Sequence, residues 1–345
     1  MLKRFEHAQG AVGDPVRTAT VVNGDAEAAA LDELRVALQR SPPEVPCKYF
    51  YDDRGSALFE QITRLPEYYP TRTERALLLE QARPIVEAAG GARLSEMVEL
   101  GSGAASKTVA LLEAALRLGG RPRYVAVDIS AHALARTREL LGQERPEVPV
   151  DEVLADYTKE LRLPPAPGGG PRLALFLGGT IGNDEDPDAI RLLRRVRSHL
   201  APGDLLLLGA NLVTDPAVIH EAYNDRAGVT AEFNRNILRS VNTLAGSAFD
   251  PQKFEHYAPY LVERQRIEMW LVAREPLEID LGRIGGRLTL APWQGIRTEI
   301  SRRFTREQVL HLLEESGFSP DRWFESPDGR FGLALGRARA ALRGL

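Results

Sequence analysis

Residues 73–209 alternate between short apolar runs and amphipathic helical patterns, and this alternation constrains the fold more than any other feature of the chain. Apolar strands separated by helices are typical of a parallel sheet that is buried on both faces. The sequence therefore predicts a doubly wound α/β fold. The expected strands are 97–100, 124–127, 150–155, 173–177 and 204–209, and the expected helices are 74–89, 107–118, 131–142 and 187–200.

The alternation ends near Asn211, and a different pattern follows. A helix is expected at 216–223, and a polar region at 233–236 separates it from four runs with period-two alternation. Such runs indicate an antiparallel sheet. They cover 254–261, 267–273, 286–291 and 296–301. A final helix, 306–315, and two strands near 322–324 and 331–335 are predicted to return to the first sheet.

These patterns divide the chain into two predicted domains, which also suits a length of 345 residues. The α/β core comprises residues 72–212 and 304–345. A second, α+β domain combines the N-terminal segment 26–71 with the insertion 213–303. The small and polar residues 1–25 show no sustained period, so we expect a disordered extension there.

Composition excludes several classes of protein. No stretch approaches the roughly 18 uncharged apolar residues that a membrane span needs, so no membrane partner is expected. The formal charge of −4 weighs against a nucleic-acid partner, because such proteins usually carry a basic excess. A single cysteine, Cys47, and scattered histidines offer no metal-ligand spacing. The N-terminus lacks the apolar run of a signal peptide, so we expect a cytoplasmic protein. We also expect a monomer that binds no metal.

A glycine turn, ELGSGAASK at 99–107, lies between a predicted strand and a helix, where small residues let a ligand approach the backbone. The dinucleotide pattern G-x-G-x-x-G fails because Ser106 holds the third glycine position. Asp128 closes the second strand, where it suits a ribose diol, and Asp156 closes the third, where it suits an adenine amino group. Each aspartate alone is more often a cap or turn residue. Together they favour a single nucleoside ligand such as S-adenosylmethionine.

Two features of the second domain suggest a substrate pocket. Glu299 and Ser301 alternate along a predicted strand and therefore point to one face. A carboxylate acceptor beside a hydroxyl donor matches a neutral imidazole, which has one N–H and one bare nitrogen. The alternative is an ordinary solvated strand face. Met269 is a candidate wall of an aromatic pocket, although filling gaps in a core is the commoner role of methionine.

Six motifs carry a resemblance to a known family. They are PCKYFYDDRGSALFEQITRLPEYYPTR at 46–72, ELGSG at 99–103, FLGGTIGN at 176–183, GVTAEFNRNIL at 228–238, RIEMWL at 266–271 and TEIS at 298–301. With these motifs the chain resembles the L-histidine Nα-methyltransferases of ergothioneine biosynthesis, from about Lys48 to the C-terminus.

The resemblance implies a Rossmann-like class I methyltransferase core and trimethylation of the α-amino group of L-histidine, through its mono- and dimethyl forms, to hercynine. It implies S-adenosylmethionine as methyl donor, and a role for each motif residue. The implied cofactor contacts are Tyr68, Gly101, Lys107, Asp128, Asp156 and Tyr157. The implied contacts of the substrate's amino-acid end are Tyr51, Asn183 and Tyr223, and those of the imidazole are Met269, Glu299 and Ser301. Phe59 is expected near the reacting amine, and Tyr51 is the candidate proton relay.

Two other functions remain open at this point. One is methylation of another amino acid such as tryptophan, although an indole has one donor and no acceptor for the pair Glu299 and Ser301. The other is a nucleoside-binding regulator without chemistry, which would keep Asp128 and Asp156 but would have no need of a second pocket.

Overall fold

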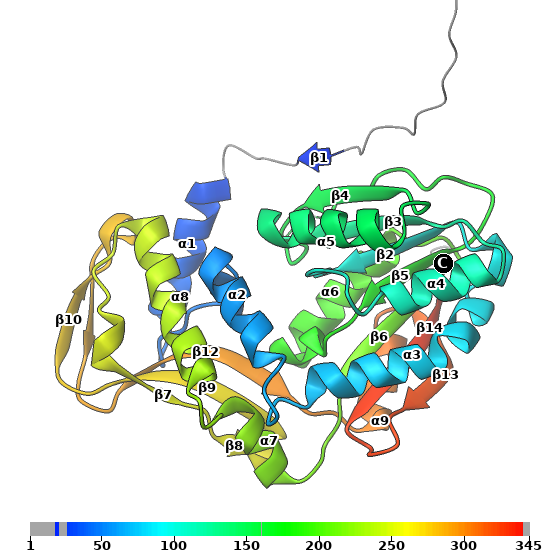
Figure 1. The fold of residues 1–345 in the computed structure, drawn as a ribbon. Helices are drawn as coiled ribbons and strands as arrows, with labels where there is room; N and C mark the ends of the chain where they lie inside the picture. Colours follow the sequence, from blue (N-terminus) through cyan, green and yellow to red (C-terminus); the bar gives the residue numbers. More distant parts are fainter. Residues whose placement is uncertain (1–17, 21–25, 160, 341–345) are drawn as a thin grey trace, which may run out of the picture.

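The computed structural model describes residues 18–20, 26–159 and 161–340. The chain forms two halves that lie side by side, one built on a large sheet and one on smaller antiparallel sheets (Figure 1). Within the described ranges, no helix is long and apolar enough to cross a membrane.

The large sheet has the order β1-β4-β3-β2-β5-β6-β14-β13. Its central strands are parallel and buried, as every residue of β2 illustrates, so the predicted doubly wound α/β core is confirmed. The parallel strands are β2 (Glu96–Leu100), β3 (Arg123–Asp128), β4 (Val150–Leu154), β5 (Arg172–Phe176) and β6 (Leu205–Asn211). The C-terminal strands β13 (Phe318–Glu325) and β14 (Phe331–Ala338) return to the sheet antiparallel, with β14 beside β6.

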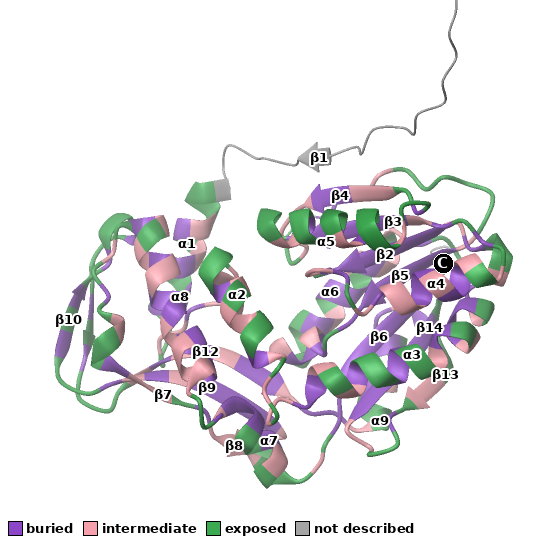
Figure 2. Cartoon of the chain, in the orientation of Figure 1, coloured by how far each residue is buried: buried purple, intermediate pink, exposed green. Residues whose placement is uncertain are grey.

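Helices cover both faces of this sheet. Met97 and Val98 are neighbours on β2 but belong to different buried clusters, because successive strand residues point to opposite faces. The cluster around Met97 includes residues of α3 (Pro70–Ala88), α4 (Val109–Arg117) and α5 (Ala131–Glu144). The cluster around Val98 includes residues of α6 (Asp186–Ser198) and α9 (Arg306–Glu315). Figure 2 shows the central strands of the sheet as a buried layer between these helices.

The other half has a core of its own, drawn from residues between Leu31 and Tyr69 and between Ile219 and Ile296. Its sheet has the order β12-β9-β7, with β8 also on β9, and all of these pairs are antiparallel as predicted. The strands are β7 (Phe254–Tyr257), β8 (Tyr260–Leu261), β9 (Arg266–Ala273) and β12 (Gly295–Arg302), and a separate hairpin joins β10 (Leu277–Asp280) to β11 (Arg287–Leu290). The helices are α1 (Ala26–Leu38), α2 (Asp53–Ile62), α7 (Pro216–Tyr223) and α8 (Val229–Ala245).

One prediction for this half is wrong. The expected polar region at 233–236 lies inside α8, because Phe233, Ile237 and Val241 recur at helical spacing and bury one face. The polar side chains that interrupt the helical pattern of the sequence, Asn234 and Asn236, are themselves buried and hydrogen-bonded. Asn234 Nδ2 donates to the Trp270 carbonyl at 3.0 Å, and Asn236 Nδ2 donates to Asp52 Oδ1 at 2.8 Å.

The predicted boundaries need two adjustments. Helix α3 begins at Pro70, so the boundary between 71 and 72 would cut a helix. Thr18–Thr20 form strand β1, which pairs in parallel with β4, so these three residues are not part of a disordered extension. Backbone pairing at the edge of the sheet holds them. The rest of the predicted extension lies outside the described residues.

Candidate functional site

A cavity of about 380 Å³ lies where the two halves meet, and residues of both halves line it. Every site residue predicted from the sequence is among its lining residues. They are Tyr51, Phe59, Tyr68, Gly101, Lys107, Asp128, Asp156, Tyr157, Asn183, Tyr223, Met269, Glu299 and Ser301. The parts that these residues play in binding stay predictions.

The glycine turn and Asp128 form one end of the cavity. Gly101 follows β2 with φ +67°, a left-handed backbone conformation that favours glycine, and the Tyr157 hydroxyl lies beside it. Asp128 Oδ2 accepts from the Gly103 N–H and Oδ1 from the Ser130 N–H, both at 2.9 Å. Burial raises the pKa of Asp128, and these backbone donors partly offset the rise. The fixed carboxylate keeps lone pairs for a ligand diol.

Two charged pairs flank this end. Lys107 Nζ bonds the buried Glu74, whose Oε1 also accepts from the Gly178 N–H at 2.5 Å, so one carboxylate organises two cavity-lining segments. Asp156 Oδ2 accepts from Lys48 Nζ at 2.6 Å. Burial alone would raise the pKa of Asp156, but Lys48 and Thr158 outweigh it and the pKa is lowered. Asp156 follows β4, which ends at Leu154.

A row of aromatic rings connects the two ends. Tyr51 and Phe59 lie edge to face with centroids 5.8 Å apart, and Phe59 contacts Tyr68 in the same way at 6.2 Å. Tyr68 then contacts Tyr223 at 6.2 Å. Tyr68 was expected at the cofactor; the structure places it in this row among the predicted substrate residues. Phe233 adds a further face beside Phe59.

Glu299 and Ser301 form the other end. Both side chains reach the cavity from β12, although the register against β9 shifts between Arg297 and Glu299. Met269 is the β9 partner of Glu299. Within the described part of the chain, the Glu299 side chain makes no hydrogen bond or ion pair. Burial raises its pKa to about 7 against the opposing charge of Arg303.

Ser301 and Asn183 are each positioned by a hydrogen bond to a neighbouring side chain. Ser301 Oγ accepts from the Tyr223 hydroxyl at 2.6 Å. Asn183 ends the 3₁₀ turn η3 (Thr180–Asn183), and its Nδ2 donates to Cys47 Sγ at 3.6 Å. Burial, chiefly, raises the pKa of this thiol to about 12, so Cys47 is a neutral partner.

The comparisons with known proteins agree with this geometry. The model of a family described as histidine-specific methyltransferase, SAM-dependent, matches residues 30–338. The chain belongs to this family. It is 41% identical over 318 residues to a histidine N-alpha-methyltransferase of Mycolicibacterium smegmatis, a match that covers 92% of this chain and 98% of the relative.

Two further relatives extend the match. A histidine N-alpha-methyltransferase of Mycobacterium tuberculosis is 39% identical over 298 residues, covering 86% of this chain and 91% of the relative. Ergothioneine biosynthesis protein 1 of Neurospora crassa is 34% identical over 207 residues, covering 59% of this chain and 23% of that one. The resemblance seen in the motifs is therefore confirmed, and the chain is an S-adenosylmethionine-dependent methyltransferase.

The residues present fit the methyl donor of this methyltransferase family. The glycine turn leaves room beside the backbone, Asp128 presents a carboxylate at the end of β3, and Tyr157 closes the space above Gly101. These features meet at the carboxyl ends of parallel strands, where α/β sheets bind nucleosides. Among the residues that the structure describes, no group of three His, Cys, Asp or Glu side chains is placed to hold a metal ion.

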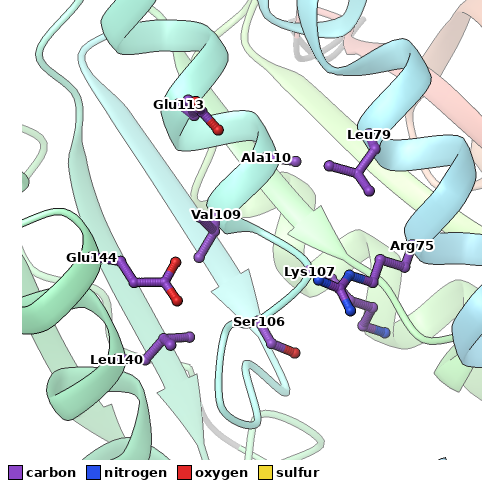
Figure 3. Close-up of a pocket in the computed structure, with 9 residues that line it drawn as sticks. All are labelled: Arg75, Leu79, Ser106, Lys107, Val109, Ala110, Glu113, Leu140 and Glu144. Carbon is purple, nitrogen blue, oxygen red and sulfur yellow. The ribbon is translucent and has the colours of Figure 1, made fainter.

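A smaller hollow of about 140 Å³ lies between α3, α4 and α5 (Figure 3). Its lining combines Arg75 and Lys107 with Glu113 and Glu144, next to apolar side chains such as Leu79. Cations and carboxylates are mixed on these helix surfaces, so the hollow favours no single class of ligand.

Sequence reasoning missed several residues that shape the main cavity: Lys48, Glu74, Phe233 and Arg303. The alternation that placed Glu299 and Ser301 on one face also predicts Arg303 on that face, so a signal was available for it. Lys48 and Glu74 depend on partners that are remote in the sequence, and no local pattern indicates them.

Proposed function

We propose that this methyltransferase trimethylates the α-amino nitrogen of L-histidine, by way of the mono- and dimethyl forms, and so makes hercynine for ergothioneine biosynthesis. The Glu299 carboxylate carries the proposal, because it has no side-chain partner among the described residues and faces the same cavity as Ser301 and Asp128. A site built to bond both nitrogens of an imidazole rejects a ring that leaves buried polar groups unpaired. The names of two relatives support this substrate, and the name of the third supports this pathway.

The cofactor end would hold S-adenosylmethionine, with Asp128 on the ribose hydroxyls, Asp156 and Tyr157 at the adenine, and Gly101 and Lys107 along the rest. When bound, S-adenosylmethionine supplies a methyl group on a sulfonium, which is already a strong electrophile. The protein therefore needs to align a neutral amine with that methyl group, and good alignment is worth roughly 7–11 kcal/mol for ideally oriented partners.

The aromatic row suits an amine that becomes a quaternary cation. Tyr51, Asn183 and Tyr223 would hold the amino-acid end of histidine and place its nitrogen near Phe59. A carboxylate there would over-stabilise the protonated amine. Aromatic faces instead stabilise each methylated cation by about 0.5–2 kcal/mol per contact. Burial, with the charge of Glu299, raises the pKa of Tyr51 well above its ordinary value. Tyr51 would therefore pass protons on as a neutral phenol rather than act as a strong base.

Tyr68 is reassigned in this proposal. Its ring lies between Phe59 and Tyr223, and burial raises the pKa of its phenol well above the ordinary value, so it is a neutral donor within the row. It would touch the substrate's amino-acid end as well as the neighbouring methyl donor.

A panel of amino acids tests the proposal. The protein is incubated with S-adenosylmethionine and each of the twenty amino acids, and products are weighed by mass spectrometry. Histidine alone should gain three methyl groups. Methylated tryptophan would instead favour an enzyme of indole amino acids, and the absence of any methylated product would favour a nucleoside-binding regulator.

A further inference from the structure

Arg303 is a fully buried cation directly behind the Glu299 and Ser301 end of the cavity. It is 1% exposed and is the largest fully buried side chain in the described chain. Its Nη1 donates to Ser301 Oγ at 3.0 Å and to the carbonyls of Ser301 and Arg302 at 3.2 and 3.1 Å. Its Nη2 reaches the Tyr223 hydroxyl at 3.5 Å, and the guanidinium carbon lies 5.5 Å from the centre of that ring.

No carboxylate pairs with Arg303 within the described residues, although burying a charge without a counterion is costly. A purely structural role would be filled better by an apolar side chain of similar volume. The carboxyl group whose pKa it influences is Glu299, at this same end of the cavity: burial raises the pKa of this carboxyl, and Arg303 opposes the rise. The placement of the Arg303 cation therefore indicates a role in ligand binding rather than in folding stability.

Arg303 and Tyr223 together determine the direction in which the Ser301 hydroxyl can donate. A serine hydroxyl has two acceptor lone pairs and one proton. Arg303 can only donate, and the Tyr223 hydroxyl also donates to Ser301 Oγ, at 2.6 Å. With both lone pairs used, the hydroxyl proton of Ser301 is left to point into the cavity. Ser301 is then a fixed donor, and it lies at the same end of the cavity as an acceptor, the Glu299 carboxylate.

We propose that Arg303 is the positioning residue that sets substrate selectivity, by holding Ser301 as a donor and so matching the cavity to a neutral imidazole. The inference rests on the proposed histidine methylation and adds the reason why the pocket distinguishes an imidazole from other five-membered aromatic rings. A freely rotating Ser301 would accept or donate equally well and would lose this discrimination.

The test compares L-histidine with β-(2-thienyl)-L-alanine, whose ring has similar size but neither an N–H donor nor a strong acceptor. In Arg303→Met, KM for histidine should rise roughly 10- to 100-fold, because two well-placed polar contacts are lost, while kcat changes much less. The ratio of kcat/KM for histidine over the thienyl analogue should fall by a similar factor. Arg303→Lys, which keeps a buried donor cation, should recover part of the ratio.

Arg172, which unlike Arg303 pairs with a buried carboxylate, that of Glu96, supplies the control. It is also a buried arginine, at the start of β5 and outside the cavity lining, and it donates to the His199 carbonyl at 2.7 Å. Arg172→Met and Arg172→Lys should lower stability and leave the selectivity ratio at the native value. An unchanged ratio in both Arg303 variants, or an equal loss in the Arg172 variants, would overturn the inference alone. A native enzyme that does not methylate histidine would overturn the proposed function as well.

Discussion

Lys48 and Asp156 form an ion pair of 2.6 Å that joins the two halves of the molecule beside the cavity. Lys48 lies in the 3₁₀ turn η1 (Cys47–Phe50), which leads into Tyr51, and Asp156 follows β4 of the α/β core. The same ammonium also pairs with Glu33 of α1 at 2.6 Å. The side chains of Lys48 and Asp156 are 16% and 19% exposed, so solvent weakens this pair only in part.

Lys48→Met should therefore lower the free energy of unfolding by about 2 kcal/mol, the loss expected for hydrogen bonds to charged groups. It should also raise KM for histidine several-fold, because η1 positions Tyr51. The control is Lys253→Met, since Lys253 pairs with Glu275 at 2.7 Å within one half and lies outside the cavity lining. Denaturant unfolding and initial-rate kinetics measure both effects. Equal behaviour of the two variants would contradict a link between the halves through Lys48.

The α/β core could be predicted from the sequence because each strand and helix is marked by a local pattern. The apolar runs of β5 and β6 are buried on both faces, and a continuous run is the expected sequence of such a strand. The second half was harder to predict. In α8 the buried Asn234 and Asn236 break the helical pattern, and only their partners on other elements explain them.

The same distinction holds for the site. Glu299 and Ser301 were found because strand alternation is a local property that survived the register shift in β12. The ion pair of Lys48 with Asp156 and the bond of Glu74 to Gly178 join residues far apart in the chain. Such pairs follow from tertiary packing, and a single sequence holds no record of them.

Histidine binding should depend on pH through Glu299. Its pKa is raised to about 7, so the carboxylate is charged only above that value, while free imidazole loses its proton near about pH 6.5. Affinity should therefore rise at least tenfold between about pH 5.5 and about pH 8. In Glu299→Gln the rise should be smaller, because only the imidazole still titrates. Calorimetric titration with S-adenosylhomocysteine present measures it, and superimposable profiles would rule out Glu299 as the acceptor.

The ligand-free protein should show the matching effect on stability. A carboxyl whose folded pKa is raised favours the protonated state, so folding loses stability as pH rises from the ordinary value near about 4.3 to about 7. Glu299→Gln should remove this part of the pH dependence. Unfolding curves across that range provide the check.

Phe59→Leu should slow the last methylation more than the first, because the loss of one aromatic face removes about 1 kcal/mol of stabilisation from the growing cation, or roughly fivefold in rate. Dimethylhistidine should accumulate in a time course followed by mass spectrometry. Phe50→Leu is the control, since Phe50 stacks on Phe233 at 4.4 Å without lining the cavity. If both variants give the native product distribution, the proposed contact between Phe59 and the reacting amine is wrong.

Asp128→Asn should weaken the binding of S-adenosylmethionine roughly 10- to 100-fold, because an amide nitrogen would face the Gly103 or Ser130 N–H and one diol acceptor would be lost. Asp151→Asn is the control; Asp151 pairs with Arg123 at 3.0 Å away from the cavity. Calorimetry compares the two variants with the native protein. Native affinity in Asp128→Asn would exclude its role at the ribose.

The most direct test of the central claim is where the methyl groups are attached. Native protein is incubated with L-histidine and excess S-adenosylmethionine, and the product is examined by tandem mass spectrometry and proton NMR. We expect a single final product with three methyl groups on the α-nitrogen and an unmodified imidazole. Methylation of a ring nitrogen, or no methyl transfer to histidine, would contradict it.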